Sequence, residues 1–239
     1  MYFDKNKRSI GIIGAMAEEI DAVKSKLSDA QTVRISGTDY VYGQLHGVNV
    51  VAAMSGIGKV NSAICAEAMI LNFSPDCIVN IGVGGALHSD LAIGSAAVAD
   101  KVVQHDMDLT PLGFEAGFLP GIDRVYIQCD SKCAELLEKA AKNSDIPCRR
   151  GIIASGDTFI NDSASKKRIA EQFGAIVCEM EGGSIGHVCA VNGVPFAVLR
   201  TISDNGDENS DSDFTNSLEA SANAALRIMN GFLELYSQE

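Results

Sequence analysis

The chain has 239 residues, of which 46% are hydrophobic and 21% are charged, and its formal net charge is −12. This composition is typical of a globular domain with a sizeable core, and the negative charge disfavours nucleic acid or an anionic membrane surface as a partner. The seven cysteines form no Cys-x-x-Cys pair, which disfavours a zinc site or a disulfide framework and fits a reducing cytoplasm. The apolar run Ile10–Ala17 is too short for a membrane span and is not typical of a secretory signal.

The first half of the chain alternates between short apolar runs, which predict strands, and helical patterns. A glycine-rich turn, Ser55–Lys59, could hold an anion on its backbone amides, but it lacks the full spacing of a nucleotide-binding loop. The helix after this turn carries Val60, Ile64, Ala68 and Leu71 as its apolar residues. The predicted elements are strands at Ser9–Gly14, Tyr40–Leu45, Val48–Met54, Asp76–Ile81 and Ser95–Val103, and helices from Met16 to about Leu27 and after Lys59.

The second half continues the alternation after a long segment, Gln104–Gly121, that is rich in Asp, Gly and Pro. A loop of this length inside a compact domain is usually functional. The alternation predicts one α/β domain over residues 1–239, with residues 1–8 as a poorly ordered N-terminal extension. The predicted elements are helices at Ser131–Lys142, around Ile185–Cys189 and from Phe214 to about Leu235, and strands at Gly151–Ser155, Ala175–Val177 and Phe196–Leu199.

Polar residues gather at the ends of two predicted strands within Ile176–Asp204. In open α/β sheets, ligands bind beyond the carboxyl ends of the strands, so this stretch is a candidate site. A solvated strand end whose charges pair with one another is an equally good interpretation of composition alone. The residues concerned are Glu179, Glu181, Arg200, Ser203 and Asp204.

Several segments, taken together, resemble the bacterial 5′-methylthioadenosine/S-adenosylhomocysteine nucleosidases of the nucleoside phosphorylase/hydrolase superfamily. The resemblance covers nearly the whole chain and keeps the order and spacing of that family. It implies hydrolysis of an N-glycosidic bond, a central twisted mixed β-sheet flanked by helices, a homodimer in the cytoplasm, and no metal or organic cofactor. The matching segments are Gly11–Met16 with Glu18-Glu19, Ser55–Val60, Ser155–Asn161, Glu179–Glu181 and Val194–Asp204.

The resemblance also assigns roles to residues. Glu19 matches a general base that activates water, Asp204 matches an acid that protonates adenine at N7, and Glu181 matches a carboxylate that holds the ribose hydroxyls. Glycoside cleavage calls for such an acid and base independently, and the helix start after Glu181 predicts that this carboxylate is ionised. The substrate, an adenine nucleoside thioether, is expected to contact Met180, Phe159, Ile160, Arg200, Ser203, Ile57, Val83, Gly84, Gly85, Leu109, Phe114, Pro120 and Phe214.

Some positions depart from the family pattern. Val83 replaces an expected hydroxyl in a region where phosphorylases of the superfamily hold phosphate, which favours hydrolysis. Ala17 replaces an acidic residue, and Leu112 and Phe114 replace larger or hydroxylated aromatics, so the 5′ substituent stays open among methylthioadenosine, S-adenosylhomocysteine, 5′-deoxyadenosine and aminofutalosine-type nucleosides.

Two other functions stay open at this point, a phosphate-dependent nucleoside phosphorylase and a non-catalytic nucleoside-binding protein on the same fold. A pure binding protein needs no acid–base pair, so the intact set of Glu19, Glu181 and Asp204 favours an enzyme. An acid at Asp204 would be opposed by a nearby guanidinium, because a positive charge favours the carboxylate. We therefore expect Arg200 to point away from Asp204.

Overall fold

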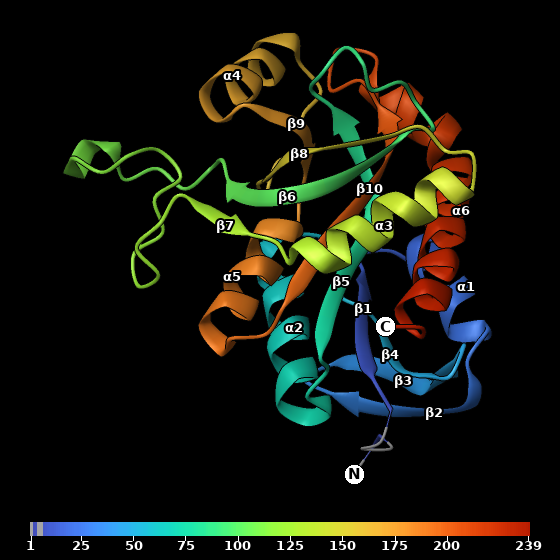
Figure 1. Ribbon diagram of the computed structural model, residues 1–239. Coiled ribbons are helices and arrows are strands. Elements are labelled where there is room, and N and C mark those ends of the chain that lie inside the picture. The colour runs from blue at the N-terminus through green and yellow to red at the C-terminus, as the bar shows by residue number, and fades with distance from the viewer. Residues whose placement is uncertain (1, 4–6) are drawn as a thin grey trace.

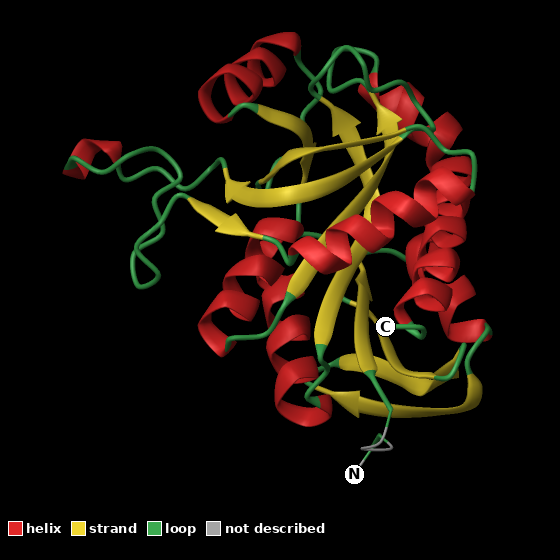
Figure 2. Ribbon diagram, in the orientation of Figure 1, coloured by secondary structure: helices red, strands yellow, loops and turns green. Residues whose placement is uncertain are grey.

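In the computed structural model, which describes residues 2–3 and 7–239, ten strands form one mixed sheet with helices packed against both of its faces (Figures 1 and 2). This arrangement confirms the expected α/β fold with a central mixed sheet. Of the expected N-terminal extension, residues 1 and 4–6 lie outside the described residues. The rings of Tyr2 and Phe3 pack against Phe73, with ring centroids 4.6 and 5.8 Å from its centroid.

The elements follow one another in the alternating order that the sequence predicts. The strands are β1 (Ser9–Gly14), β2 (Ser28–Ile35), β3 (Thr38–Leu45), β4 (Val48–Met54), β5 (Cys77–Ala86), β6 (Ala96–Gln104), β7 (Tyr126–Gln128), β8 (Cys148–Ser155), β9 (Ala175–Glu179) and β10 (Phe196–Asp204). The helices are α1 (Ala17–Ser25), α2 (Lys59–Phe73), α3 (Ser131–Asn143), α4 (Ser163–Phe173), α5 (Gly182–Asn192) and α6 (Ser210–Tyr236), with a short 3₁₀ helix at Thr110–Leu112.

Strand β5 is the centre of the sheet and is buried along its whole length. It pairs in parallel with β1 and with β10, and its last two residues pair antiparallel with β9. Because β10 also pairs with β6, β6 with β8, and β8 with β9, these five strands close into a ring on one side of the sheet. The carboxyl ends of β5, β9 and β10 therefore meet in one region.

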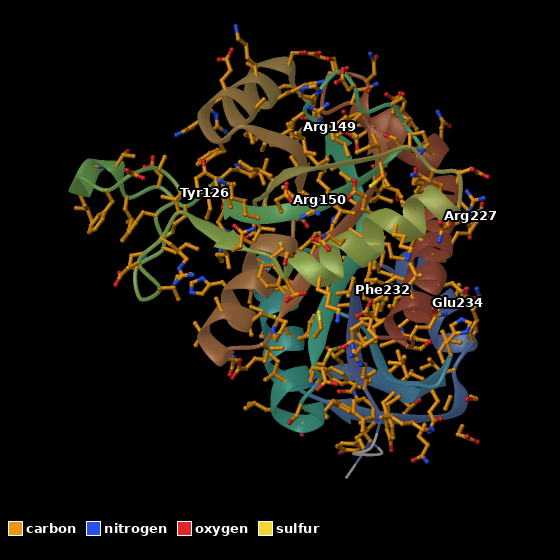
Figure 3. The ribbon with its side chains drawn as sticks, viewed as in Figure 1. Tyr126, Arg149, Arg150, Arg227, Phe232 and Glu234 are labelled. Carbon is orange, nitrogen blue, oxygen red and sulfur yellow. The ribbon has the colours of Figure 1, made fainter. Side chains whose placement is uncertain are left out.

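Helices α1, α3 and α6 cover one face of the sheet, where the fully buried Phe232 of α6 belongs to the larger core cluster (Figure 3). Helices α2 and α5 cover the other face. Of the four apolar residues that the sequence shows on α2, Ala68 is buried, whereas Val60 and Leu71 are both 69% exposed and Ile64 is 48% exposed. This helix has apolar residues all round, and its sheet-facing side consists of Cys65, Ala66, Met69, Ile70 and Phe73.

Three elements were not predicted. Strand β7 has three residues and is too short to show a pattern, and β2 and α4 carry too little apolar pattern. In β2, every side chain is exposed or half-buried, and the strand is held at the sheet edge by its pairing with β3. In α4, only Ile169 and Phe173 are buried. Between β6 and β7, the predicted loop leaves the body of the molecule and projects from it (Figure 1, left). No helix within residues 2–3 and 7–239 is both long and apolar enough to cross a membrane.

Candidate active site

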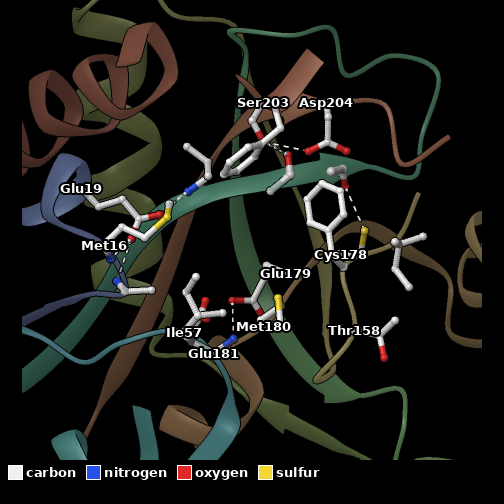
Figure 4. A pocket seen from close by; sticks show the side chains of 17 residues that line it. Met16, Glu19, Ile57, Thr158, Cys178, Glu179, Met180, Glu181, Ser203 and Asp204 are labelled. Carbon is white, nitrogen blue, oxygen red and sulfur yellow. Dashed lines mark hydrogen bonds between the residues drawn. The ribbon is translucent and has the colours of Figure 1, made fainter. Parts of the chain in front are cut away.

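One cavity lies where the carboxyl ends of β5, β9 and β10 meet (Figure 4). It brings together residues that are far apart in the chain, and most of them were predicted from the sequence to lie in one site. The predicted residues that line it are Glu19, Ile57, Val83, Gly84, Gly85, Phe159, Ile160, Met180, Glu181, Ser203, Asp204 and Phe214. The lining also includes Glu179, which was noted at a strand end but given no role, and Ala15, Met16, Thr158 and Cys178, which were not predicted as site residues.

Glu19 enters the cavity from the first turn of α1, where Glu18 is exposed and Glu19 is 3% exposed. Its Oε2 accepts hydrogen bonds from the N–H groups of Ala15 at 2.7 Å and Met16 at 3.0 Å, and its Oε1 accepts one from Val83 at 3.1 Å. Burial raises the pKa of Glu19, while the charge of Arg200 and the backbone donors oppose the rise. A buried carboxylate held at three points and with a raised pKa has the properties of a general base.

Asp204 lies across the cavity from Glu19, at the end of β10 (Figure 4). The pairing of β10 with β5 shifts register between Ile202 and Asp204, so a bulge at Ser203 sets the direction of the strand end. The Asp204 carboxyl accepts hydrogen bonds from the Ser203 hydroxyl at 2.8 Å and from the Gly206 N–H at 2.9 Å. These two donors fix the orientation of a carboxyl that is 2% exposed.

Glu181 lines the same cavity from the N-cap of α5, below both carboxyl groups in the view of Figure 4. Its Oε1 accepts a hydrogen bond from the Gly58 N–H at 2.9 Å, which ties it to the glycine-rich turn before α2. The predicted dipole effect is outweighed, because burial raises the pKa of Glu181 to about 7, with a further contribution from the Glu179 carboxylate. Glu181 therefore changes its charge near neutral pH.

Arg200 does not line the cavity but lies beneath it, with a side chain that is 1% exposed. Its Nη2 donates to Asn80 at 2.5 Å, makes a short hydrogen bond with Glu179, and lies 3.5 Å from Glu181. The expectation that this guanidinium points away from Asp204 is confirmed by these contacts. Its position as a direct substrate contact stays a prediction.

The glycines of β5 allow carboxylates to rest against the strand. A Cβ atom at position 82 would lie 2.7 Å from Oε1 of Glu19, and one at position 85 would lie 2.7 Å from Oδ1 of Asp204. Real Cβ atoms do not approach oxygen so closely, so residues 82 and 85 must lack a side chain for both groups to keep their places.

The rest of the cavity wall is apolar and partly aromatic. The rings of Phe159 and Phe214 meet edge to face with centroids 5.7 Å apart, and Ile160 is 6% exposed beside them. Ile57, by contrast, is 53% exposed at the rim. An aromatic edge of this kind can pack against a flat heterocycle. Among residues 2–3 and 7–239, no three His, Cys, Asp or Glu side chains are grouped to hold a metal ion.

Leu109, Phe114 and Pro120 are not brought to this cavity within one chain. They lie on the segment that projects between β6 and β7 (Figure 1). The Phe114 ring stacks on Phe118 with centroids 4.9 Å apart, and it is 44% exposed. Contact between these residues and a substrate stays a prediction.

Residues 9–234 match the family described as the phosphorylase superfamily. The chain belongs to this superfamily. It is 40% identical over 223 residues to the aminodeoxyfutalosine nucleosidase of Campylobacter jejuni, which covers 92% of this chain and 97% of that protein. The chain is also similar in fold to members of the superfamily whose structures are known.

Two solved structures are similar to the chain over almost their whole length. The futalosine hydrolase of Helicobacter pylori is 34% identical with a TM-score of 0.92, and the match covers 97% of this chain and 100% of that one. The 5′-methylthioadenosine/S-adenosylhomocysteine nucleosidase of Neisseria meningitidis, solved with methylthio-immucillin-A, is 29% identical with a TM-score of 0.92, covering 95% and 99%. These similarities place the chain with the nucleosidases of the superfamily.

Proposed function

We propose that the protein hydrolyses the N-glycosidic bond of adenine nucleosides with a 5′ thioether, such as 5′-methylthioadenosine and S-adenosylhomocysteine, to give adenine and a 5-thio-substituted ribose. The observation that carries this proposal is the placement of Glu19 and Asp204 on opposite sides of one cavity that Glu181 also lines. A glycosidase needs one carboxyl group to protonate the leaving group and another to activate the attacking water on the other side of the sugar.

In the proposed reaction, the Glu19 carboxylate takes a proton from a water molecule as the water attacks the anomeric carbon. Asp204 donates its proton to N7 of adenine, so that the base leaves neutral rather than as an unstable anion. Glu181 accepts hydrogen bonds from the vicinal ribose hydroxyls. The developing positive charge on the ribosyl ring is stabilised by the carboxylates that line the cavity.

The charge of the cavity supports hydrolysis over phosphorolysis. Four carboxyl groups line it, those of Glu19, Glu179, Glu181 and Asp204. The guanidinium beneath it, Arg200, is held by Glu179, and Val83 offers no hydroxyl. A phosphate ion would meet negative charge without a free cation, whereas a neutral water molecule would not.

We therefore expect adenine release to be independent of phosphate. Purified protein is incubated with 5′-methylthioadenosine with and without inorganic phosphate, and the products are separated by chromatography. Equal rates and free 5-methylthioribose are the expected result, since the cavity has no site for the anion. Turnover that requires phosphate and yields a ribose 1-phosphate would contradict the proposal.

The same assay, run on a panel of nucleosides, tests the 5′ substituent. Met16, Ile57 and Phe214 supply apolar surface to the cavity, which suits a thioether or an unsubstituted 5′ methyl group. The Campylobacter jejuni relative is named for aminodeoxyfutalosine, so that nucleoside belongs in the panel with S-adenosylhomocysteine and 5′-deoxyadenosine. The ratio of kcat/KM values ranks the four.

We further propose that the protein acts as a homodimer joined through the exposed side of α2 and the neighbouring α5. Val60, Ile64 and Leu71 on α2 and Val191 on α5 are between 48% and 69% exposed, and large apolar residues gathered on one surface are typical of an interface. In such a dimer, the projecting segment of each chain would carry Leu109, Phe114 and Pro120 toward the cavity of the other.

The substitution Ile64→Asp is expected to give a monomer and to raise KM about tenfold or more, because the cavity loses apolar contacts from the second chain. Light scattering after size-exclusion chromatography gives the oligomeric state, and initial rates give KM. The control is Lys167→Asp, because the Lys167 side chain on α4 is 72% exposed. It should change neither the oligomeric state nor KM. A dimeric Ile64→Asp protein with unchanged KM would remove this surface from the interface.

A further inference from the structure

Glu179 lines the cavity but is neither the acid, the base nor the ribose-binding carboxylate of the reaction proposed above. Its carboxylate accepts hydrogen bonds from the N–H of Glu181 at 3.1 Å and from the N–H of Gly182 at 2.8 and 3.0 Å. It also accepts short hydrogen bonds from the Ser155 hydroxyl and from Nη2 of Arg200. A carboxylate has about four lone-pair positions, so these donors leave Glu179 no acceptor with which to activate water.

Glu181, two residues later, shows the opposite pattern. It accepts one hydrogen bond from the Gly58 N–H at 2.9 Å, and its Oε2 lies 3.5 Å from Nη2 of Arg200. That same Nη2 is already shared between Glu179 and Asn80. The positive charge is therefore directed mainly at Glu179, and Glu181 keeps acceptor positions for a ligand.

We propose that Glu179 is a positioning residue for Glu181. By holding Arg200 and the two backbone amides at the start of α5, it prevents a close ion pair between Arg200 and Glu181, so that Glu181 can accept hydrogen bonds from both ribose hydroxyls. This inference rests on the proposed function, because it takes Glu181 as the carboxylate that binds the ribose.

Glu179 also affects the charge of Glu181. Burial and then the Glu179 carboxylate raise the pKa of Glu181 to about 7, and Arg200 opposes the rise. Glu181 is thus ionised above this pH and protonated below it, and its capacity to accept two hydroxyl hydrogen bonds is lost as the pH falls. Removing the charge at Glu179 takes away one cause of the raised pKa and frees Arg200 to approach Glu181. Both changes lower the pKa of Glu181.

The test measures this effect through binding rather than turnover. The ligands are a carbon-linked analogue of 5′-methylthioadenosine, which has no N-glycosidic bond to cleave, and its 2′-deoxy form. Calorimetry gives the ratio of their Kd values across the neutral pH range. In the wild-type protein, we expect the ratio to favour the hydroxylated ligand by about 10- to 100-fold when Glu181 is ionised and to fall as the pH drops.

In Glu179→Gln, the pH at which this ratio falls should move downward by about one unit or more. The ratio above that pH should also shrink, because Arg200 then competes with the ribose hydroxyls for Glu181. The control Ser155→Ala removes one hydrogen bond to Glu179 but leaves its charge, so its midpoint should match that of the wild type. A structural defect alone would lower stability without moving the midpoint.

Glu179→Asp gives a second measurement that does not depend on the folding of the Gln variant. It keeps the negative charge but draws it back from Arg200, so the midpoint should move in the same direction by a smaller amount. A wild-type midpoint in either variant overturns the inference. Failure of the proposed function gives a different result. In that case the wild-type protein itself would bind the two ligands with equal Kd at every pH.

Discussion

Replacement of Asp204 by Asn should lower kcat by about three orders of magnitude or more, because an amide cannot deliver a proton to the leaving adenine. The shape of the site should survive. The Asn oxygen can still accept the hydrogen bond from the Gly206 N–H at 2.9 Å, and its amide group can donate to the Ser203 hydroxyl. Steady-state assays of adenine release give kcat, and calorimetry with the carbon-linked analogue gives the Kd.

The matched control is Asp207→Asn, three residues later in the chain and outside the cavity. It makes the same chemical change, and its kcat should stay within a few-fold of that of the wild type. An Asp204→Asn protein with similar activity to this control would show that another group protonates the base. Loss of ligand affinity together with turnover would instead indicate a binding role for Asp204.

Glu19→Gln should lower kcat by about 10²–10⁴-fold, the usual contribution of a positioned general base. The amide oxygen can keep the hydrogen bonds from Ala15 and Met16, while its NH₂ group would face the Val83 N–H. We therefore expect a modest loss of stability and little change in the Kd of the carbon-linked analogue. The neighbouring Glu18→Gln, on the exposed side of the same helical turn, is the control. Normal turnover in Glu19→Gln would assign the base to another residue.

The pH profile of the wild-type protein should follow from the same groups. Burial raises the pKa of Glu19, and it raises the pKa of Glu181 to about 7. In the proposed reaction both residues act in the ionised form, so we expect kcat/KM to fall as the pH drops through these pKa values.

The strand pattern of the sequence predicted the bounds of some elements closely and missed the bounds of others. Ser9–Gly14 and Val48–Met54 were predicted with the observed bounds because their residues are apolar and covered on both faces. The end of β5 was placed at Ile81, five residues short, because glycine is disfavoured in strands. There, pairing with β10 and β9 outweighs the local preference of the glycines.

Tertiary contacts explain what else could not be predicted. Glu179 follows the same apolar run that pointed to Glu181, but its role depends on Arg200 and Ser155, which come from other strands. The pKa of Glu181 likewise depends on burial and on a neighbouring carboxylate, and neither is visible in a helix-start pattern. The projecting position of Phe114 depends on how the segment between β6 and β7 leaves the sheet.

The glycines of β5 limit how this enzyme could be made more heat-resistant. Exchanging glycine for alanine often stabilises a protein by restricting its unfolded chain, and Gly231 in α6 is open to it, since an added Cβ would meet Ala140 at an ordinary 3.5 Å. Gly82 and Gly85 are closed to the same exchange, because a methyl group there would displace Glu19 or Asp204. Stabilising exchanges of this kind are therefore open in the outer helix α6, while the central strand keeps glycines that leave room for the two carboxyl groups.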